Sequence, residues 1–416
     1  MSPQYIKEKR LNLSVVANSA ELLKAEALPL QQVDDTPRAG GSTAPNPPLC
    51  SAQGQALHQN GAGQAQADPL LKWHYPWQQG CRYHSFSQYL KGRFPFKVHK
   101  IALHAGFTCP NRDGYKGTGG CTYCANESFS PNARGTLQPV GEQVRNGKQY
   151  LKRRYGAEKF IVYFQAFSNT YADIETLMSR YNEALEDKDV IGLSIGTRPD
   201  CVPDEVLSLL DSYKDDYHLW VEYGLQSIHD RTLKRVNRCH TYKDFEEAVR
   251  RTKALGINVC AHVILGLPGE DWADMMATAE ALSKLGIDGV KLHHLYVARS
   301  TPMAEEYSRG LVKTMGVEEY VTLAADFLER IPSETTVQRL VGDTEGEALI
   351  SPIWSLAKAE ILQAITGELR RRDSYQGKKC LPCTVLVQGR HGSVPASPEN
   401  LDFSLTTPQK NKGSRV

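Results

Sequence analysis

The sequence has no long apolar run. Its 416 residues contain no stretch of about 18 uninterrupted apolar residues, the length needed to cross a bilayer. The first residues also lack the apolar core of a secretory signal, and Glu8, Glu21 and Glu26 are untypical of an organelle transit peptide. We therefore predict a cytoplasmic protein with no membrane partner. An organelle is the alternative if the N-terminal extension is a transit peptide.

An excess of charge of one sign is also lacking. The 49 Lys and Arg residues nearly balance the 47 Asp and Glu residues, so the net charge of +2 does not by itself indicate a nucleic acid partner. The ten cysteines are an even number, which would allow disulfides. Because no secretory signal is apparent, we expect a reducing compartment, where clustered cysteines usually bind metal or take part in catalysis.

Large apolar residues are scarce near both ends of the chain. Residues 31–68 are mainly Gly, Ala, Pro, Ser, Gln and Asn, and such a segment cannot bury enough apolar surface to offset its ordering entropy. We predict a disordered extension over 1–69 and a disordered tail over 379–416. Between them we expect a larger domain over 70–298 and a smaller one over 299–378.

Apolar runs alternate with amphipathic stretches in the larger domain. The apolar runs, which predict strands, span 159–167, 190–199, 218–227, 257–269 and 289–297. The amphipathic stretches, which predict helices, span 173–186, 204–213, 242–255 and 271–285. This alternation predicts an α/β fold with parallel strands, in a barrel or an open sheet. After about residue 300 the pattern becomes mostly helical.

Three cysteines stand close together in residues 105–131. Eleven residues separate Cys109 from Cys121, and two separate Cys121 from Cys124. Four glycines in the longer gap allow unusual backbone angles and a close approach of N–H groups to an anionic centre. A structural zinc site normally has four ligands, whereas a 4Fe-4S cluster bound by three thiolates leaves one iron open. The alternative is a zinc site completed by His104 or by a distant cysteine.

This loop resembles the cluster loop of the radical S-adenosylmethionine (SAM) superfamily, with Tyr123 as the aromatic residue before the last cysteine. The gap of eleven residues departs from the usual gap of three, but it is similar to a bacterial subgroup whose loop reads CPNRDG…GGCTYC. That subgroup is related to the catalytic subunit of Elongator. The resemblance covers about residues 73–378 and includes the segments VHKIALHAGFTCPNRDG, GTRPDC, VEYGLQS and RRDSYQGK.

The resemblance implies a partial (β/α)6 radical SAM barrel with a small, mainly helical C-terminal domain. It implies a 4Fe-4S cluster held by Cys109, Cys121 and Cys124, and SAM that chelates the open iron through its amino and carboxylate groups. An electron from the cluster then cleaves the sulfonium and releases a 5′-deoxyadenosyl radical. A reductant such as flavodoxin or ferredoxin is an expected partner.

Polar residues at the strand ends are candidates for contacts with SAM, because function gathers at the C-terminal ends of barrel strands. The sequence lacks the Gly-Gly-Glu motif that the superfamily often has after the second strand. The candidates are Gln165, Ser168, Asn169, Thr197, Arg198, Glu222 and Gln226. Arg198 suits a bidentate bond to a carboxylate, and Glu222 stands inside an apolar strand, where an acid must be paired or functional. The alternatives are a helix-capping loop at 165–170 and a structural ion pair for Arg198; Asp200 is a candidate for substrate contact.

Other residues of this region have two interpretations. The turn that follows His262 resembles a superfamily turn near the adenine, but it is also an ordinary strand-to-helix turn. Since side chains alternate along a strand, one of His293 and His294 should face the barrel interior. Cys380 and Cys383 form a second CxxC, which suits a metal site or a redox pair. We identify no catalytic acid or base.

Acidic residues are absent between Asp68 and Asp113. The basic and aromatic residues of this segment include Lys72, Trp73, Tyr75, Trp77, Arg82, Tyr83, Phe86, Tyr89, Lys91, Arg93, Phe94, Phe96, Lys97, Lys100 and Arg112. A second cluster consists of Lys148, Tyr150, Lys152, Arg153, Arg154 and Tyr155. Basic residues among aromatics suit phosphate contacts and base stacking. The alternative is that the aromatics are core and the cations lie on a solvated face.

The resemblance extends to a substrate. Elongator-like relatives act on wobble uridines of tRNA, which implies tRNA as a partner and modification of the C5 substituent of uridine as the reaction. No acetyltransferase domain is recognisable, so the full activity of Elongator is not implied. Two alternatives stay open: a radical SAM enzyme acting on a small metabolite or a protein side chain, and a non-catalytic metal-binding module.

Overall fold

The computed structural model of the chain describes residues 80–342 and 348–380. Outside these ranges lie the predicted extension 1–69, most of the predicted tail 379–416, Cys383, Lys72, Trp73, Tyr75 and Trp77. Within the described ranges, no helix combines the length and the apolar composition that crossing a membrane requires.

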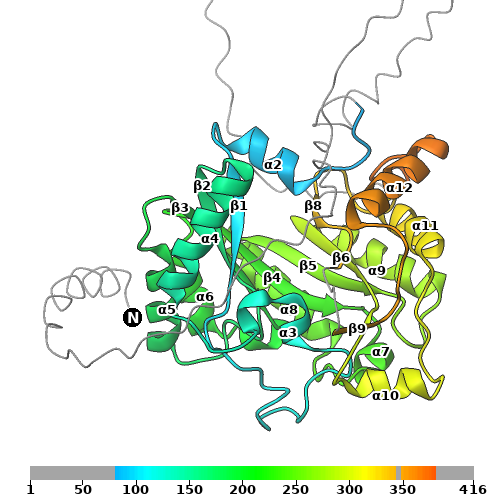
Figure 1. The fold of residues 1–416 in the computed structure, drawn as a ribbon, viewed down its shortest axis with the longest axis horizontal. Helices are drawn as coiled ribbons and strands as arrows, with labels where there is room; N and C mark the ends of the chain where they lie inside the picture. Colours follow the sequence, from blue (N-terminus) through cyan, green and yellow to red (C-terminus); the bar gives the residue numbers. More distant parts are fainter. Residues whose placement is uncertain (1–79, 343–347, 381–416) are drawn as a thin grey trace, which may run out of the picture. The chain divides into compact units, whose positions relative to one another are not determined.

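A parallel sheet of seven strands forms the centre of the fold (Figure 1). In their order across the sheet, the strands are β1 (Val98–Leu103), β2 (Lys159–Phe164), β3 (Val190–Thr197), β4 (His218–Gln226), β5 (Asn258–Leu265), β6 (Gly289–His294) and β8 (Thr336–Arg339). Every neighbouring pair runs parallel. A separate antiparallel pair consists of β7 (Val297–Ala298) and β9 (Leu349–Ser351).

The predicted parallel α/β class is confirmed, and so are the strand runs of the barrel. The seventh strand, β8, comes from residues 299–378, which were predicted to be mainly helical. Because β8 pairs with β6, this region adds a strand to the sheet of the barrel.

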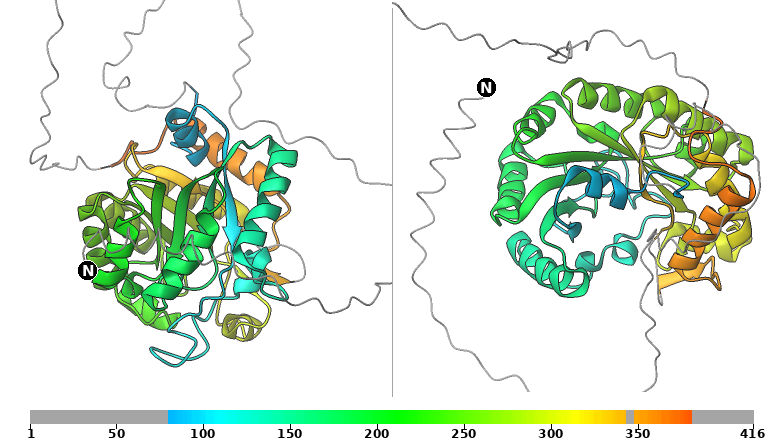
Figure 2. Two further views of the ribbon diagram at one scale, coloured as in Figure 1. Left: turned by 90° about the vertical axis from the view of Figure 1, so that its left-hand side faces the viewer. Right: turned by 90° about the horizontal axis from the view of Figure 1, so that it is seen from above.

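Helices cover the outer face of the curved sheet, as the view from above in Figure 2 shows. The helices of the described ranges are α2 (Phe86–Arg93), α3 (Asn126–Phe129), α4 (Val140–Tyr155), α5 (Ile174–Leu185), α6 (Asp204–Asp211), α7 (Asp230–Arg235), α8 (Tyr242–Ala254), α9 (Trp272–Leu285), α10 (Pro302–Ser308), α11 (Val317–Leu328) and α12 (Lys358–Arg371). Helix α2 does not belong to the outer layer and lies across the inside of the curve (Figure 2). Two short 3₁₀ helices are η3 (Pro131–Ala133) and η4 (Pro199–Cys201). The predicted helices at 173–186, 204–213, 242–255 and 271–285 correspond to α5, α6, α8 and α9.

Local sequence signals set the helix ends. Helices α8 and α9 each begin with a capping box, made by Thr241 with Asp244 and by Asp271 with Asp274. Helix α9 ends at Gly286, whose φ of 68° lies in the left-handed region that glycine adopts without strain. These caps hold the helices in place between successive strands.

Helix α2 packs against the N-terminal halves of the strands, and the segment that contains it connects the two edge strands, β8 and β1. Ser85, just before α2, forms a parallel bridge with Val337 of the edge strand β8, and the chain then continues into β1 at the other edge. The rings of Phe86 and Tyr89 lie 6.1 and 5.6 Å from that of Trp220 on β4. Phe86 and Tyr89 are therefore packing residues, as the alternative interpretation of the aromatic segment expects.

Two glycines make a matched test of this packing. A Cβ at Gly289 on β6 would lie 2.8 Å from Cζ3 of the buried Trp220, whereas a Cβ at Gly367 in α12 would meet nothing within 4 Å. Gly289→Ala should lower the free energy of unfolding by about 1–3 kcal/mol through overpacking. Gly367→Ala should raise it by about 0.5–1 kcal/mol, because alanine loses less backbone entropy in a helix. Urea unfolding measures both, and equal effects of the two substitutions would contradict the packing described here.

Candidate active site

A cavity opens at the C-terminal ends of the parallel strands. Counted with the open solvent in its mouth, its volume is about 1150 Å³. Cys109, Cys121 and Cys124 all line it, together with Arg238 and with Arg339 of β8. The three cysteines and the two arginines therefore share one cavity.

The loop after β1 brings the three cysteines together. The backbone N–H of Arg112 donates to the carbonyl of Cys109 over 2.8 Å, and the Arg112 side chain donates to the carbonyl of Cys124 over 2.7 Å. Gly120 has a φ of 83°, and a Cβ there would lie 2.9 Å from Nε of Arg112. A glycine at this position therefore lets the arginine bond to both ends of the loop.

A buried arginine lies beside Cys121. Nη1 of Arg238 is 3.6 Å from the sulfur of Cys121, and Nη2 donates to the carbonyl of Gly224 over 2.7 Å. Burial raises the pKa of the Cys121 thiol, but Arg238 outweighs burial and brings that pKa below its usual value. Burial and the charge of Cys121 raise the pKa of Cys124 to about 11. A bound cation would let the set ionise together, because metal binding releases thiol protons. These residues therefore fit a thiolate-bound iron–sulfur cluster.

Six of the seven residues predicted to contact SAM line the same cavity as the cysteines. They are Gln165, Ser168, Thr197, Arg198, Glu222 and Gln226. Asn169 lies behind the wall, where its buried amide donates to the carbonyls of Phe164 over 3.1 Å and Gly196 over 2.7 Å. Asn169 thus ties the end of β2 to the end of β3. The contacts of all seven residues with SAM stay predictions.

Arg198 is bonded within the protein. Its Nε and Nη2 each lie 2.9 Å from one carboxylate oxygen of Asp200, and its Nη1 donates to the carbonyl of Arg238 over 2.8 Å. Burial alone would raise the pKa of Asp200, but Arg198 and Lys116 lower it to about 2. This bidentate pair favours the structural interpretation of Arg198. The same pair occupies the carboxylate of Asp200, whose contact with the substrate stays a prediction.

The deepest charged group of the site is the carboxylate of Glu222, which is fully buried on β4. Lys100 of β1 donates to Oε1 over 2.6 Å, and Lys291 of β6 donates to Oε2. Nε2 of His262 on β5 lies 2.8 Å from Oε2. Burial would raise the pKa of Glu222, but the two ammonium groups hold it well below its usual value. We predicted that an acid in this strand must be paired or functional, and Glu222 is paired.

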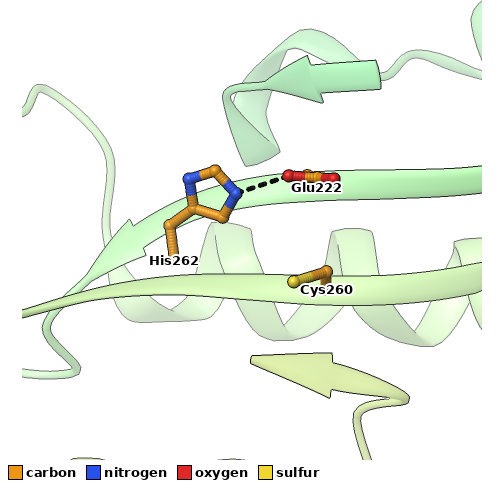
Figure 3. Close-up of side chains that lie close together, drawn as sticks. All are labelled: Glu222, Cys260 and His262. Carbon is orange, nitrogen blue, oxygen red and sulfur yellow. Dashed lines mark hydrogen bonds and ion pairs between the residues drawn. The ribbon is translucent and has the colours of Figure 1, made fainter. Parts of the chain in front are cut away.

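Glu222, Cys260 and His262 also form a group with the spacing of metal ligands (Figure 3). The candidate ligand atoms lie within 4.8 Å of one another. However, an ammonium group already bonds to each carboxylate oxygen, and burial raises the pKa of Cys260, so its thiol stays protonated. We therefore assign the three residues to a hydrogen-bonded network and not to a metal centre.

Lys291 and Arg238 were not predicted, and Lys100 was predicted only as one of the basic residues that suit phosphate contacts, whereas it bonds to Glu222. Lys291 stands inside the apolar strand β6, just as Glu222 stands inside β4. A search of the apolar runs for charged residues would therefore have found Lys291. Of the predicted histidine pair, His293 faces the interior with its ring 5.8 Å from that of His262. His294 packs against Trp354 with ring centroids 4.2 Å apart. The two side chains thus pack against different neighbours, although both line the cavity.

Neighbouring acids pair with the two lysines of the second basic cluster. Lys148 pairs with Asp187 and Asp189 at 2.7 Å each, and Lys152 pairs with Asp189 at 3.2 Å. Three lysines share Asp189, because Lys159 lies 2.9 Å from it as well. This cluster therefore offers less positive charge to a phosphate backbone than its sequence indicated.

Comparison with known proteins identifies two family models along the chain. The model of the radical SAM superfamily matches residues 112–282, and that of the Radical_SAM C-terminal domain matches residues 287–371. YtqA of Bacillus subtilis is 42% identical over 297 residues, which cover 71% of this chain and 92% of YtqA. YhcC of Escherichia coli K12 is 39% identical over 266 residues, which cover 64% of this chain and 85% of YhcC.

A solved structure shares the fold. The archaeal Elp3 of Methanocaldococcus infernus, with an N-terminal deletion, matches with a TM-score of 0.51 at 17% sequence identity. The match covers 68% of this chain and 64% of that one. At this level of identity the likeness concerns the fold alone.

Proposed function

The chain belongs to the radical SAM superfamily, and we propose that Cys109, Cys121 and Cys124 bind its cluster and that the enzyme modifies the wobble uridine of tRNA. The family's cofactors are a 4Fe-4S cluster and SAM. When bound, the cluster supplies the electron that cleaves the sulfonium of SAM. The observation that carries the proposal is that the three cysteines line one cavity with six polar strand-end residues.

The protein's own residues have separate tasks around this cavity. Arg238 stabilises negative charge on the sulfur of Cys121 and lies in the wall beside it. Arg112 bonds to both ends of the cysteine loop and so holds its shape. Gln165, Ser168 and Thr197 lie at the ends of β2 and β3, where their polar groups suit the amino and carboxylate groups of SAM.

Removing one cysteine tests the cluster assignment. Cys109→Ala, Cys121→Ala and Cys124→Ala should each abolish cluster binding, because three thiolates are needed to hold the cluster. Iron content and visible absorption after anaerobic reconstitution measure the cluster, and 5′-deoxyadenosine formed with dithionite and SAM measures cleavage. Cys81→Ala is the control: Cys81 is buried next to Gln88 at α2, and this variant should keep both properties. A cysteine variant that keeps full cleavage, or a wild-type protein that holds zinc and no iron, would contradict the assignment.

Support for an RNA substrate comes from the relation to Elongator and from one surface feature. Tyr115, in the loop between Cys109 and Cys121, is 75% exposed. Its ring lies 6.2 Å from that of Tyr171. Exposed aromatic rings stack unpaired bases, and wobble uridine stands in a single-stranded loop. The two tyrosines therefore suit an anticodon loop better than a small metabolite.

Tyr115→Ala should weaken the binding of an anticodon stem-loop about tenfold, because stacking contributes roughly 1–3 kcal/mol per base. Fluorescence anisotropy at several salt concentrations measures this, and the affinity should fall with salt as phosphate contacts require. Tyr150→Ala on α4 is the control, since Tyr150 is 50% exposed but stands outside the cysteine loop. Affinity that is independent of salt, or an equal loss in both variants, would favour a substrate other than RNA.

A further inference from the structure

His262 has one available tautomer. Both oxygens of the Glu222 carboxylate bond to lysine ammonium groups, which keep it ionised. An ionised carboxylate only accepts hydrogen bonds. Nε2 of His262, 2.8 Å from Oε2 of Glu222, must therefore carry a proton and donate it. Figure 3 shows the ring turned so that Nε2 meets Glu222 and Nδ1 points away from it.

The imidazole of His262 is also neutral. Burial lowers its pKa, the hydrogen bond to Glu222 opposes this, and Lys291 lowers it further, to about 4. A neutral imidazole has one N–H, so Nδ1 carries a lone pair and can only accept. Nδ1 makes no hydrogen bond with any residue in the part of the chain that the structure describes. Because His262 lines the cavity, this acceptor is available to whatever fills it.

Positively charged groups and a second histidine surround the ring of His262. Arg339 and His293 line the same cavity. The charges of Lys291 and Arg339 both act on the His262 ring, and the ring of His293 is 5.8 Å away. The inner wall thus offers one fixed acceptor beside cationic and N–H groups. A complementary ligand edge offers an N–H donor to Nδ1 and oxygen acceptors to the neighbouring cations.

The Watson–Crick edge of uracil has this pattern, with N3–H between O2 and O4. We infer that Nδ1 of His262 accepts a hydrogen bond from N3–H of the target uracil and thereby selects uridine over cytidine. Cytosine has a bare nitrogen at N3, so its lone pair would face that of Nδ1 and leave both unsatisfied, which is costly in a buried site. This inference rests on the proposed action on tRNA uridine. Glu222 is then a positioning residue, because it acts on the base only through the tautomer of His262.

The test uses the full chain, reconstituted anaerobically with iron and sulfide, and two anticodon stem-loops that differ only in uridine or cytidine at the wobble position. Wild-type protein should bind the uridine RNA about tenfold more tightly than the cytidine RNA. His262→Gln should reduce this ratio to less than threefold, because an amide can turn to offer either a donor or an acceptor. The phosphate contacts are the same for both RNAs, so the ratio isolates the reading of the base.

The role of His262 and the proposed action on tRNA can be overturned separately. Equal binding of both RNAs by the wild type, or an unchanged ratio in His262→Gln, overturns the role of His262 and leaves the action on tRNA intact. Failure of the wild type to bind either RNA overturns the proposed function and the reading of uridine with it. A second readout needs no RNA: the ¹⁵N spectrum of histidine-labelled protein should lose, in His262→Gln, the signals of one neutral ring with a bare Nδ1. A proton on Nδ1 of that ring would overturn the inference.

Discussion

The ionised carboxylate of Glu222, buried between Lys100 and Lys291, is the interaction on which the rest of the site depends. Removing one partner of a buried ion pair typically costs about 3–5 kcal/mol, because a charge is left unpaired in the interior. The three charged residues come from β1, β4 and β6, so their pairing connects these three strands across the interior. The same carboxylate fixes the tautomer of His262, which links a structural constraint to the face that a substrate would meet.

At the cysteine loop, the buried charge is positive and the group that it stabilises is negative. There Arg238 is the buried cation and the Cys121 sulfur is the group whose negative charge it stabilises. The parallel order of the strands brings the ends of β1 to β6 to one side, so the cysteine loop and the interior network open into one cavity. A cofactor bound at the cysteines would therefore lie in the same cavity as His262.

The strands were predictable because parallel strands buried on both faces are almost entirely apolar, as in β2 and β3. Strand β8 was not, since its four residues, TVQR, have no apolar run. The cysteines were found from spacing and resemblance, and Glu222 from its apolar surroundings. Its partner Lys100 is 122 residues away, and only the register of the folded strands brings the two together. The role of Phe86 and Tyr89 was not predictable. Composition alone does not distinguish aromatic residues that stack on bases from those that pack in the interior, here against Trp220.

We propose that one cavity holds both the cluster at the three cysteines and SAM beside it. The most direct measurement is the electron paramagnetic resonance spectrum of the reduced, reconstituted protein before and after SAM is added. If SAM binds the open iron at this site, the spectrum should change, and the change should be absent when a SAM analogue without the amino and carboxylate groups is used. If a protein with a full complement of cluster gives the same spectrum with and without SAM, then SAM does not bind the cluster at this site.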